Sequence, residues 1–562
     1  MGGRAVGRRA LSIVATVAAV VTATAVGQAG ALPPDTVPLR LIAFGDLHGN
    51  LLPPQDSRGE VVRSDGQSVA AGGAAYLAAY VRQLRGQADD SVLYAVGDSW
   101  GASPIESAMF HDEPTIEFLG DLDVTAAALG NHEFDNGFAE LQRLRDGGCH
   151  PEDGCRFTES YEGAKFPFLG ANVTNTDGSP AALPFDISYV EGIPVGAIGV
   201  LPRNTPEYIR GDAIENLNFG DEIEAVNRTA DTLDALGIRS IILLYKGDIA
   251  AGSEADPCSL DNGRAKEVTT TVSPHVDLIV TSDGDGQFNC SYPDPAGRQR
   301  TVLQGASHGR ILSVADLTID RATRDVVRDR TVAFNQVITH DITPDPRTEE
   351  FVARVADKSS DTAAQEVGRI AADITRDQSP SGESSLGNLV ADAQLAATAP
   401  LGAQIALTNP GGLRGDLHFD NSGVVTYGEA YGVQPFGNLL QILELTGAQL
   451  TAVLEQQFQT DAAGAAHERI LAPSHNLHYT LDRLAPAGQR IRDITVSDAP
   501  LDPEATYSVV VNDYLAGGSD GFSVFAEARS RVGAGEELAS LTTFLSHPTP
   551  CLPPDRDRIH VH

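Results

Sequence analysis

The sequence has 562 residues, 42% of them hydrophobic, so it can bury more than one hydrophobic core and we expect two large domains. With 40 lysines and arginines against 76 aspartates and glutamates, its formal net charge is -36 and its pI is near 4.6. Such acidity argues against binding to nucleic-acid polymers or anionic membranes. An anionic substrate must therefore be attracted by local cations.

The first 31 residues have the pattern of an export signal. Basic side chains in the first nine residues precede an apolar run over residues 10–26, and residues 29–31 are typical of a cleavage site. We predict a signal peptide over residues 1–31 and a secreted or cell-envelope location. The Arg8-Arg9 pair also suits twin-arginine export. The apolar run is short for a membrane anchor, and no later stretch is long and apolar enough to cross a bilayer.

Five cysteines in an exported chain suggest disulfides. Cys149 and Cys155 flank a small loop that contains proline and glycine, and Cys258 and Cys290 bracket a second segment. These two pairings are the economical prediction, which leaves Cys551 without a partner.

The first large domain is predicted over residues 38–337, where apolar runs alternate with amphipathic segments. Strands are expected at residues 39–44, 92–96, 195–201, 240–244, 276–280 and 312–318, and helices at residues 73–83, 114–119, 138–145 and 222–236. This alternation indicates a layered α/β domain.

Prolines at positions 344 and 346 then interrupt the pattern, and a polar helix follows over residues 347–361. We predict a linker helix within residues 343–366, a second α+β domain over residues 368–548, and a tail over residues 549–562. The second domain opens with a helix through Ala397, and a strand follows at residues 405–408.

Polar side chains stand where two early strands end. Asp46 and His48 follow the run 39–44 and lie two residues apart, so both can face one metal ion, and Asp98 follows the next strand, where it can bridge two ions. Glycines beside these residues allow close approach of the backbone at strand ends, where α/β proteins keep their ligand sites.

A third stretch follows the apolar run 124–129. The amide oxygen of Asn131 can ligate a metal, His132 lies beside it, and the carboxylate of Asp135 can hold that imidazole in place. A histidine in a turn is often only a core residue. Three such stretches in order, each after a buried strand, favour a metal site for phosphoester chemistry.

The second domain has polar and aromatic side chains in glycine-rich loops. Asn409 and Arg414 are placed to bind phosphate or ribose hydroxyls. Phe436 and Phe522 lie beside Gly, Pro or Asp, where two rings could sandwich a flat base, each stacking contact being worth about 1–3 kcal/mol. The alternative is that both rings fill the domain core.

Together, these motifs resemble those of the secreted bifunctional metallophosphatases and 5'-nucleotidases. The resemblance implies a four-layer metallophosphoesterase sandwich and a nucleotide-binding domain that rotates about the linker helix. It implies a two-ion centre and a catalytic histidine: Asp46, His48 and Asp98 for one divalent ion, Asp98 and Asn131 for the other, and His132, oriented by Asp135, for the phosphoryl transition state. It also implies that Phe436 and Phe522 hold the base.

The sequence departs from the family where three further histidines complete the metal centre. Tyr245, followed by Lys246, stands at the first position, and Asp283 and Asp285 stand at the other two. If these carboxylates are ligands, the oxygen-rich set favours Mn, Mg or Ca over Zn. The site is then a hydrolase retuned to such ions, a centre with one ion and Lys246 as a surrogate charge, or an inactive centre. The aspartates can also form a plain solvated turn.

We therefore predict an exported, metal-dependent phosphoester hydrolase of the 5'-nucleotidase type, which removes phosphate from nucleoside 5'-phosphates or related nucleotides. The reaction would use divalent metal ions, and the family resemblance implies two of them. The alternative is a nucleotide-binding protein whose phosphatase centre has lapsed. The expected partner is a nucleotide or nucleoside and not a nucleic-acid polymer. Nothing in the sequence indicates the oligomeric state.

Overall fold

The computed structural model describes residues 35–54, 59–62, 67–207, 209, 214–247, 258, 264–283, 286–420, 422–460 and 466–562. The predicted signal peptide and Asp285 lie outside the described residues.

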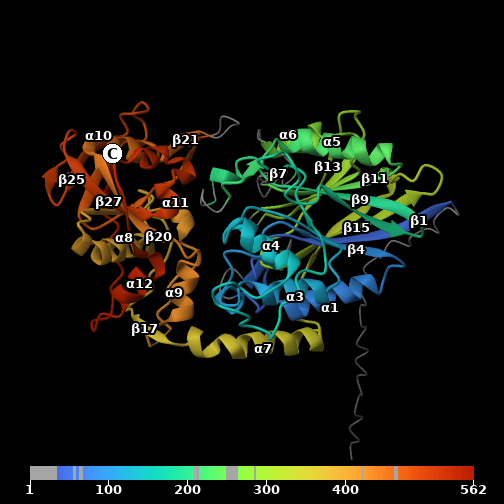
Figure 1. The fold of residues 1–562 in the computed structure, drawn as a ribbon, viewed down its shortest axis with the longest axis horizontal. Coiled ribbons are helices and arrows are strands. Elements are labelled where there is room, and N and C mark those ends of the chain that lie inside the picture. Colours follow the sequence, from blue (N-terminus) through green and yellow to red (C-terminus); the bar gives the residue numbers. More distant parts are fainter. Residues whose placement is uncertain are drawn as a thin grey trace, which may run out of the picture.

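The N-terminal domain is built on two six-stranded sheets (Figure 1). The first has the order β16 (Val332–Val337), β15 (Ile311–Asp320), β1 (Thr36–Phe44), β4 (Ser91–Val96), β5 (Ala126–Ala128) and β6 (Phe168–Leu169). The second has the order β13 (Phe288–Pro293), β14 (Gln299–Gln304), β12 (Leu278–Ser282), β11 (Ser240–Lys246), β9 (Ile193–Val200) and β8 (Phe185–Val190).

The two sheets face each other across an apolar core to which strands of both contribute, among them Leu41 of β1 and Leu244 of β11. Helices α1 (Ala74–Arg85), α3 (Glu113–Asp121) and α4 (Phe138–Asp146) cover the first sheet, and α5 (Glu222–Ala235) and α6 (Arg264–Thr271) cover the second. The central parallel strands are apolar on both faces because both faces are buried. The predicted four-layer α/β sandwich is confirmed.

The linker segment forms α7 (Pro346–Ala363). Its first turn is capped by Asp345, whose Oδ1 accepts a hydrogen bond of 2.9 Å from the Thr348 amide, with proline at the first helical positions. Phe351 and Val355 of α7 are buried in the core of the N-terminal domain. The helix therefore packs along that domain before the chain enters the second one (Figure 1).

The C-terminal domain contains a five-stranded and a four-stranded sheet. The first has the order β23 (Ala472–Pro473), β18 (Ile405–Thr408), β27 (Thr506–Asn512), β20 (Leu439–Thr446) and β28 (Arg531–Glu536); the second has β26 (Ala499–Pro500), β25 (Ile491–Val496), β24 (Leu477–Leu481) and β29 (Ile559–Val561). Its main helices are α8 (Ser385–Thr398), α9 (Tyr427–Val433), α10 (Gly447–Glu455) and α12 (Glu537–Leu545). Because β29 pairs with β24, the last residues of the chain are part of this domain.

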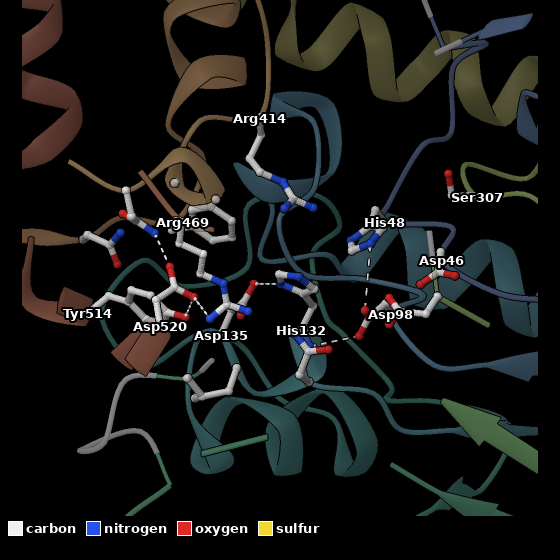
Figure 2. Close-up of a pocket in the computed structure, with 18 of the residues that line it drawn as sticks. Asp46, His48, Asp98, His132, Asp135, Ser307, Arg414, Arg469, Tyr514 and Asp520 are labelled. Atoms are coloured by element: carbon white, nitrogen blue, oxygen red, sulfur yellow. Dashed lines mark hydrogen bonds and ion pairs between the residues drawn. The ribbon is translucent and has the colours of Figure 1, made fainter. Parts of the chain in front are cut away.

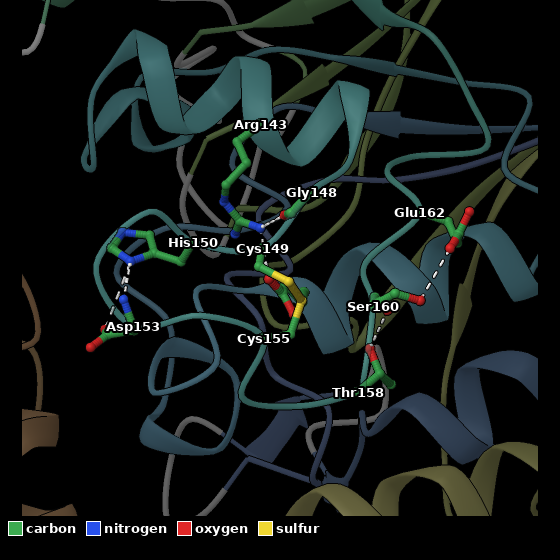
Figure 3. Close-up of a disulfide and its surroundings, with 10 residues drawn as sticks. Arg143, Gly148, Cys149, His150, Asp153, Cys155, Thr158, Ser160 and Glu162 are labelled. Atoms are coloured by element: carbon green, nitrogen blue, oxygen red, sulfur yellow. Dashed lines mark hydrogen bonds and ion pairs between the residues drawn. A yellow bond between two sulfur atoms is a disulfide. The ribbon is translucent and has the colours of Figure 1, made fainter.

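Both predicted disulfides form. Cys149 is bonded to Cys155 in a small loop next to α4 (Figure 3), and Cys258 is bonded to Cys290 of β13. Cys551 is the free cysteine, as predicted.

A buried carboxylate opens α12. Glu537 is 2% exposed and accepts hydrogen bonds from the side-chain amides of Gln394 (3.1 Å), Asn438 (3.0 Å) and Asn512 (3.2 Å). Burial outweighs these bonds and raises the pKa of Glu537 from 4.5 to about 7. The native state thus binds this proton more tightly than the unfolded chain does.

We expect a pH-dependent loss of stability from this residue. Its contribution is fully present below pH 4.5 and is lost as the pH rises toward 7, by about 3 kcal/mol in total. The fall in melting temperature from pH 5 to pH 8 should therefore be smaller in Glu537→Gln than in the wild type. Glu536→Gln, a change at the exposed neighbour, should follow the wild type. An equal fall in all three proteins would contradict the assignment.

Candidate active site

The loops after β1 and β4 bring the first predicted ligands together. The amide of Asp46 donates to Gly97 O (3.0 Å) and that of His48 donates to Asp98 O (2.9 Å). Asp46, His48 and Asp98 have φ angles of 49°, 46° and 48°, a left-handed backbone that non-glycine residues rarely adopt. Strain of this kind is concentrated at functional sites, where the surrounding structure holds it in place.

The third motif is attached to the second by Glu133, a role that the sequence analysis missed. Its buried carboxylate accepts hydrogen bonds from the amides of Gly130 (2.6 Å), Asp98 (2.9 Å) and Ser99 (2.6 Å). Burial, together with the negative charge of Asp98, raises the pKa of Glu133 to about 8. By accepting from these three amides, the Glu133 carboxylate holds the loops that follow β4 and β5 together.

His132 and Asp135 form the predicted pair. His132 Nδ1 lies 2.8 Å from Asp135 Oδ2, so Nε2 is the nitrogen left for a substrate. Burial disfavours the charged ring, but the carboxylates of Asp135 and Asp98 together outweigh this effect and raise the pKa of His132. The His132 amide also donates to Asp98 Oδ1 (3.0 Å), which ties the pair to the predicted metal ligands.

His48 is oriented in a similar way. Its Nδ1 lies 2.9 Å from Gly101 O, and its Nε2 lies 4.0 Å from Asp98 Oδ2. Burial lowers the pKa of His48 well below its ordinary value, so the ring is neutral and can ligate a metal. Asn131 lines the same cleft.

Lys246 lies at the centre of the predicted metal site. Its Nζ is 2.7 Å from Asp46 Oδ1, 2.9 Å from Asp98 Oδ2 and 2.9 Å from Asp283 Oδ1. Burial disfavours the charged amine, but the carboxylates outweigh this effect and raise the pKa of Lys246 well above its ordinary value. The ammonium therefore remains charged.

Strand alternation explains why Lys246 enters the site and Tyr245 does not. Ile241, Leu243 and Tyr245 of β11 face the core under α5 and α6, whereas Ile242 and Leu244 face the first sheet. Lys246 continues the second face, and the expectation that Tyr245 takes the place of a ligand histidine is wrong. The structure brings Asp283 to the site, as predicted, but as a partner of the lysine.

The two-ion centre implied by the resemblance does not fit these residues. The oxygens of Asp46 and Asp98 that would share a cation are turned toward the Lys246 ammonium. Donor atoms of His48, Asp98 and His132 still lie within 4.8 Å of one another among the described residues. The donor atoms that remain suit at most one ion.

The C-terminal domain closes the other side of a cleft of about 570 Å³ (Figure 2). Asn409, Arg414 and Phe436, the side chains predicted to bind substrate, line it. The Phe436 ring lies 5.9 Å from the His132 ring, and the Arg414 guanidinium carbon lies 5.7 Å from the Phe436 centroid. Burial lowers the pKa of Arg414, which approaches the carboxylates of the N-terminal domain.

Phe522 requires a correction. Its side chain is 0% exposed and packs in the core of the C-terminal domain, with its ring 6.1 Å from that of Phe525. It does not line the described cleft, so the predicted pair of stacking rings is wrong in its second member. Tyr514, in the same sequence stretch, lines the cleft instead.

Several other cleft residues were not identified from the sequence. Asp520 accepts from Tyr514 Oη (3.0 Å) and Asn409 Nδ2 (3.0 Å) and pairs with Arg469 (3.3 Å). His308, with φ 58°, donates its amide to Asp46 O (2.7 Å). A charged residue in the glycine-rich stretch 517–521 was the available signal for Asp520, whereas nothing local marked His308.

Comparisons with known proteins give the same picture. A model of the 5'-nucleotidase C-terminal domain matches residues 362–527. A snake venom 5'-nucleotidase of Naja atra is 25% identical over 531 residues, which cover 89% of this chain and 93% of that protein. The crystal structure of a 5'-nucleotidase precursor from Thermus thermophilus has a TM-score of 0.75 at 26% identity, covering 93% of this chain and 99% of that chain.

Two bacterial relatives are longer than this chain. Endonuclease YhcR of Bacillus subtilis is 30% identical over 497 residues, covering 86% of this chain but 37% of its own length. A cell wall protein of Listeria monocytogenes is 29% identical over 554 residues, covering 90% of this chain and 67% of its own length.

The sandwich, its strand-end loops and the facing α+β domain give this protein the two-domain architecture of the 5'-nucleotidases. Residues 362–527 match the 5'-nucleotidase C-terminal domain family, and most of the chain is similar to 5'-nucleotidases from bacteria to vertebrates. No helix within the described residues has the length and apolar character of a membrane span.

Proposed function

We propose that this protein hydrolyses nucleoside 5'-phosphates or related nucleotides. The observation that carries the proposal is the shared cleft, in which the His132–Asp135 pair of one domain faces Arg414 and Phe436 of the other. A phosphoryl group beside His132 is then within reach of a guanidinium, and the attached nucleoside is beside aromatic rings. The names of the relatives support the same substrate class.

Each side chain has a chemical task in this proposal. Arg414 binds phosphoryl oxygens. A water oxygen bonds to phosphorus as the ester phosphorus–oxygen bond breaks, and a proton of that water ends on the departing nucleoside oxygen. His132, held through Nδ1 by Asp135, donates a hydrogen bond from Nε2 to the charge that develops. Phe436 and Tyr514 contact the base, while Asn409 and Asp520 are placed for ribose hydroxyls. Holding the phosphoryl group against the imidazole supplies the positioning part of catalysis.

A second candidate is nucleotide binding without turnover. The contacts of Lys246 with three carboxylates favour it, because they involve the side chains from which the family builds its metal centre. The cleft and its aromatic rings serve both candidates equally. Export to the cell envelope is part of the proposal in both cases and is supported by the two disulfides and by the cell wall relative.

The test is an assay of the purified protein on AMP, on other nucleotides, on a generic phosphomonoester and on a phosphodiester, with Mn, Mg, Ca, Co or Zn added. Release of phosphate from AMP in preference to the generic ester supports the proposal. Better activity with Mn, Mg or Ca than with Zn would indicate that carboxylate oxygens dominate the metal ligands. AMP binding measured by calorimetry with no release under any metal would establish the second candidate. Equal rates on all esters would indicate a phosphatase without base recognition.

A further inference from the structure

We infer that the metal centre of this protein holds at most one divalent ion, because the Lys246 ammonium takes the position of a cation between Asp46 and Asp98. The inference rests on the proposed function only in locating the metal centre at these residues. It does not depend on whether the centre turns a substrate over.

The lysine is built into the centre by its surroundings. Its side chain is almost fully buried, and its stem runs over Gly97, where an added Cβ would lie 2.8 Å from Lys246 Cβ. Gly97 has a φ of 70°, so a larger residue there would be both strained and obstructive. The lack of a side chain at Gly97, in the loop after β4, therefore leaves room for the lysine side chain.

The three contacts of the ammonium have the pattern of a bridging cation. Asp46, Asp98 and Asp283 each turn one oxygen to Nζ at 2.7 to 2.9 Å, and they come from the ends of β1, β4 and β12. An ammonium has three donors, so all of them are used. A metal ion in the same place would have to displace a charged group that is fixed to β11.

The position of the ammonium also limits where a second ion can lie. Lys246 Nζ contacts one oxygen each of Asp46 and Asp98, so an ion shared by these two carboxylates would lie directly beside a fixed positive charge. Like charges at such short range repel strongly in a buried site. The site next to the lysine thus suits one ion and not two.

Donors remain for that one ion. Asp46 Oδ2 is buried and has no hydrogen-bond partner among the described residues, and His48 directs Nε2 toward Asp98. A ring nitrogen of His48 and a carboxylate oxygen of Asp98 lie within 4.8 Å of each other. A buried carboxylate oxygen without a partner is costly unless a cation or water satisfies it.

The test is metal stoichiometry, measured without substrate. Mn²⁺ is titrated by calorimetry, and the metal retained after gel filtration is measured by elemental analysis. His111, His150 and Asp153 form a second group of possible ligands. His150 and Asp153 lie in the loop that the Cys149–Cys155 disulfide closes (Figure 3). All proteins therefore carry His111→Ala, so that this surface group does not add to the count.

We expect no more than one equivalent of Mn²⁺ with Lys246 present and one additional equivalent in Lys246→Ala. Lys165→Ala, a change at an exposed lysine, should leave the count unchanged. Because Lys246→Ala leaves buried carboxylates uncompensated, it is also purified with Mn²⁺, and its melting temperature should rise with Mn²⁺ far more than that of the parent. Two equivalents in the presence of Lys246, or an unchanged count in Lys246→Ala, would overturn the inference. Absence of AMP hydrolysis would not affect it.

Discussion

Replacement of His132 by alanine is expected to lower the rate of AMP hydrolysis by about 10²- to 10⁴-fold, the usual contribution of a positioned acid–base group. The imidazole is held by Asp135 at 2.8 Å and faces the wall formed by the C-terminal domain. AMP binding should be largely retained, because Arg414 and the aromatic side chains of the cleft remain. The measurement is kcat for phosphate release, with AMP affinity determined separately by calorimetry.

His111→Ala is the matched control for this prediction. His111 lies in the same domain but outside the cleft, with its ring stacked on that of His150 at 3.8 Å. The control should retain wild-type rates. A His132→Ala protein that hydrolyses AMP at the wild-type rate would remove His132 from the proposed mechanism.

The second large effect distinguishes two phenylalanines for which the sequence predicts the same role, stacking on the base. Phe522→Ala is expected to cost about 3–5 kcal/mol of folding free energy, because it opens a cavity in the core around Phe525. Phe436→Ala should leave stability nearly unchanged and weaken nucleotide binding by about 1–3 kcal/mol, because its ring lines the cleft. Denaturant titration and AMP calorimetry on both variants measure the two quantities.

A generic phosphomonoester provides the control for base recognition. Its turnover should be insensitive to Phe436→Ala, since it has no nucleoside to stack. If Phe522→Ala proved stable but impaired in AMP binding, the core placement of that ring would be contradicted.

Much of the fold followed from patterns that burial imposes. Apolar runs such as 39–44 and 92–96 became β1 and β4, since strands covered on both faces must be apolar throughout. Proline and a polar helical pattern were sufficient to place α7. Short strands such as β5, only three residues long, have too few residues to show a period.

Within the site, the residues that directly follow a strand could be predicted from the sequence. The residues whose position depends on which face of a strand they occupy could not. Asp46, His48, Asp98 and His132 meet because their strands are neighbours in one sheet. Whether Tyr245 or Lys246 enters the site depends on which residues of β11 face the first sheet. The spacing of residues in a sequence motif does not give this information. The same limit applies to Tyr514 and Phe522, which are eight residues apart in the sequence but have different environments.

The burial of Phe351 and Val355 makes α7 mechanically a part of the N-terminal domain, to which Arg82 and Arg347 also fasten its first turn through ion pairs with Asp345 and Asp121. Swinging the helix itself would expose these apolar side chains. Any hinge between the halves must therefore lie beyond Ala363, in the few residues that precede β17 (Glu366–Arg369). For a rotation of one half against the other, the pivot is thus a point at one end of the connector and not an axis along it.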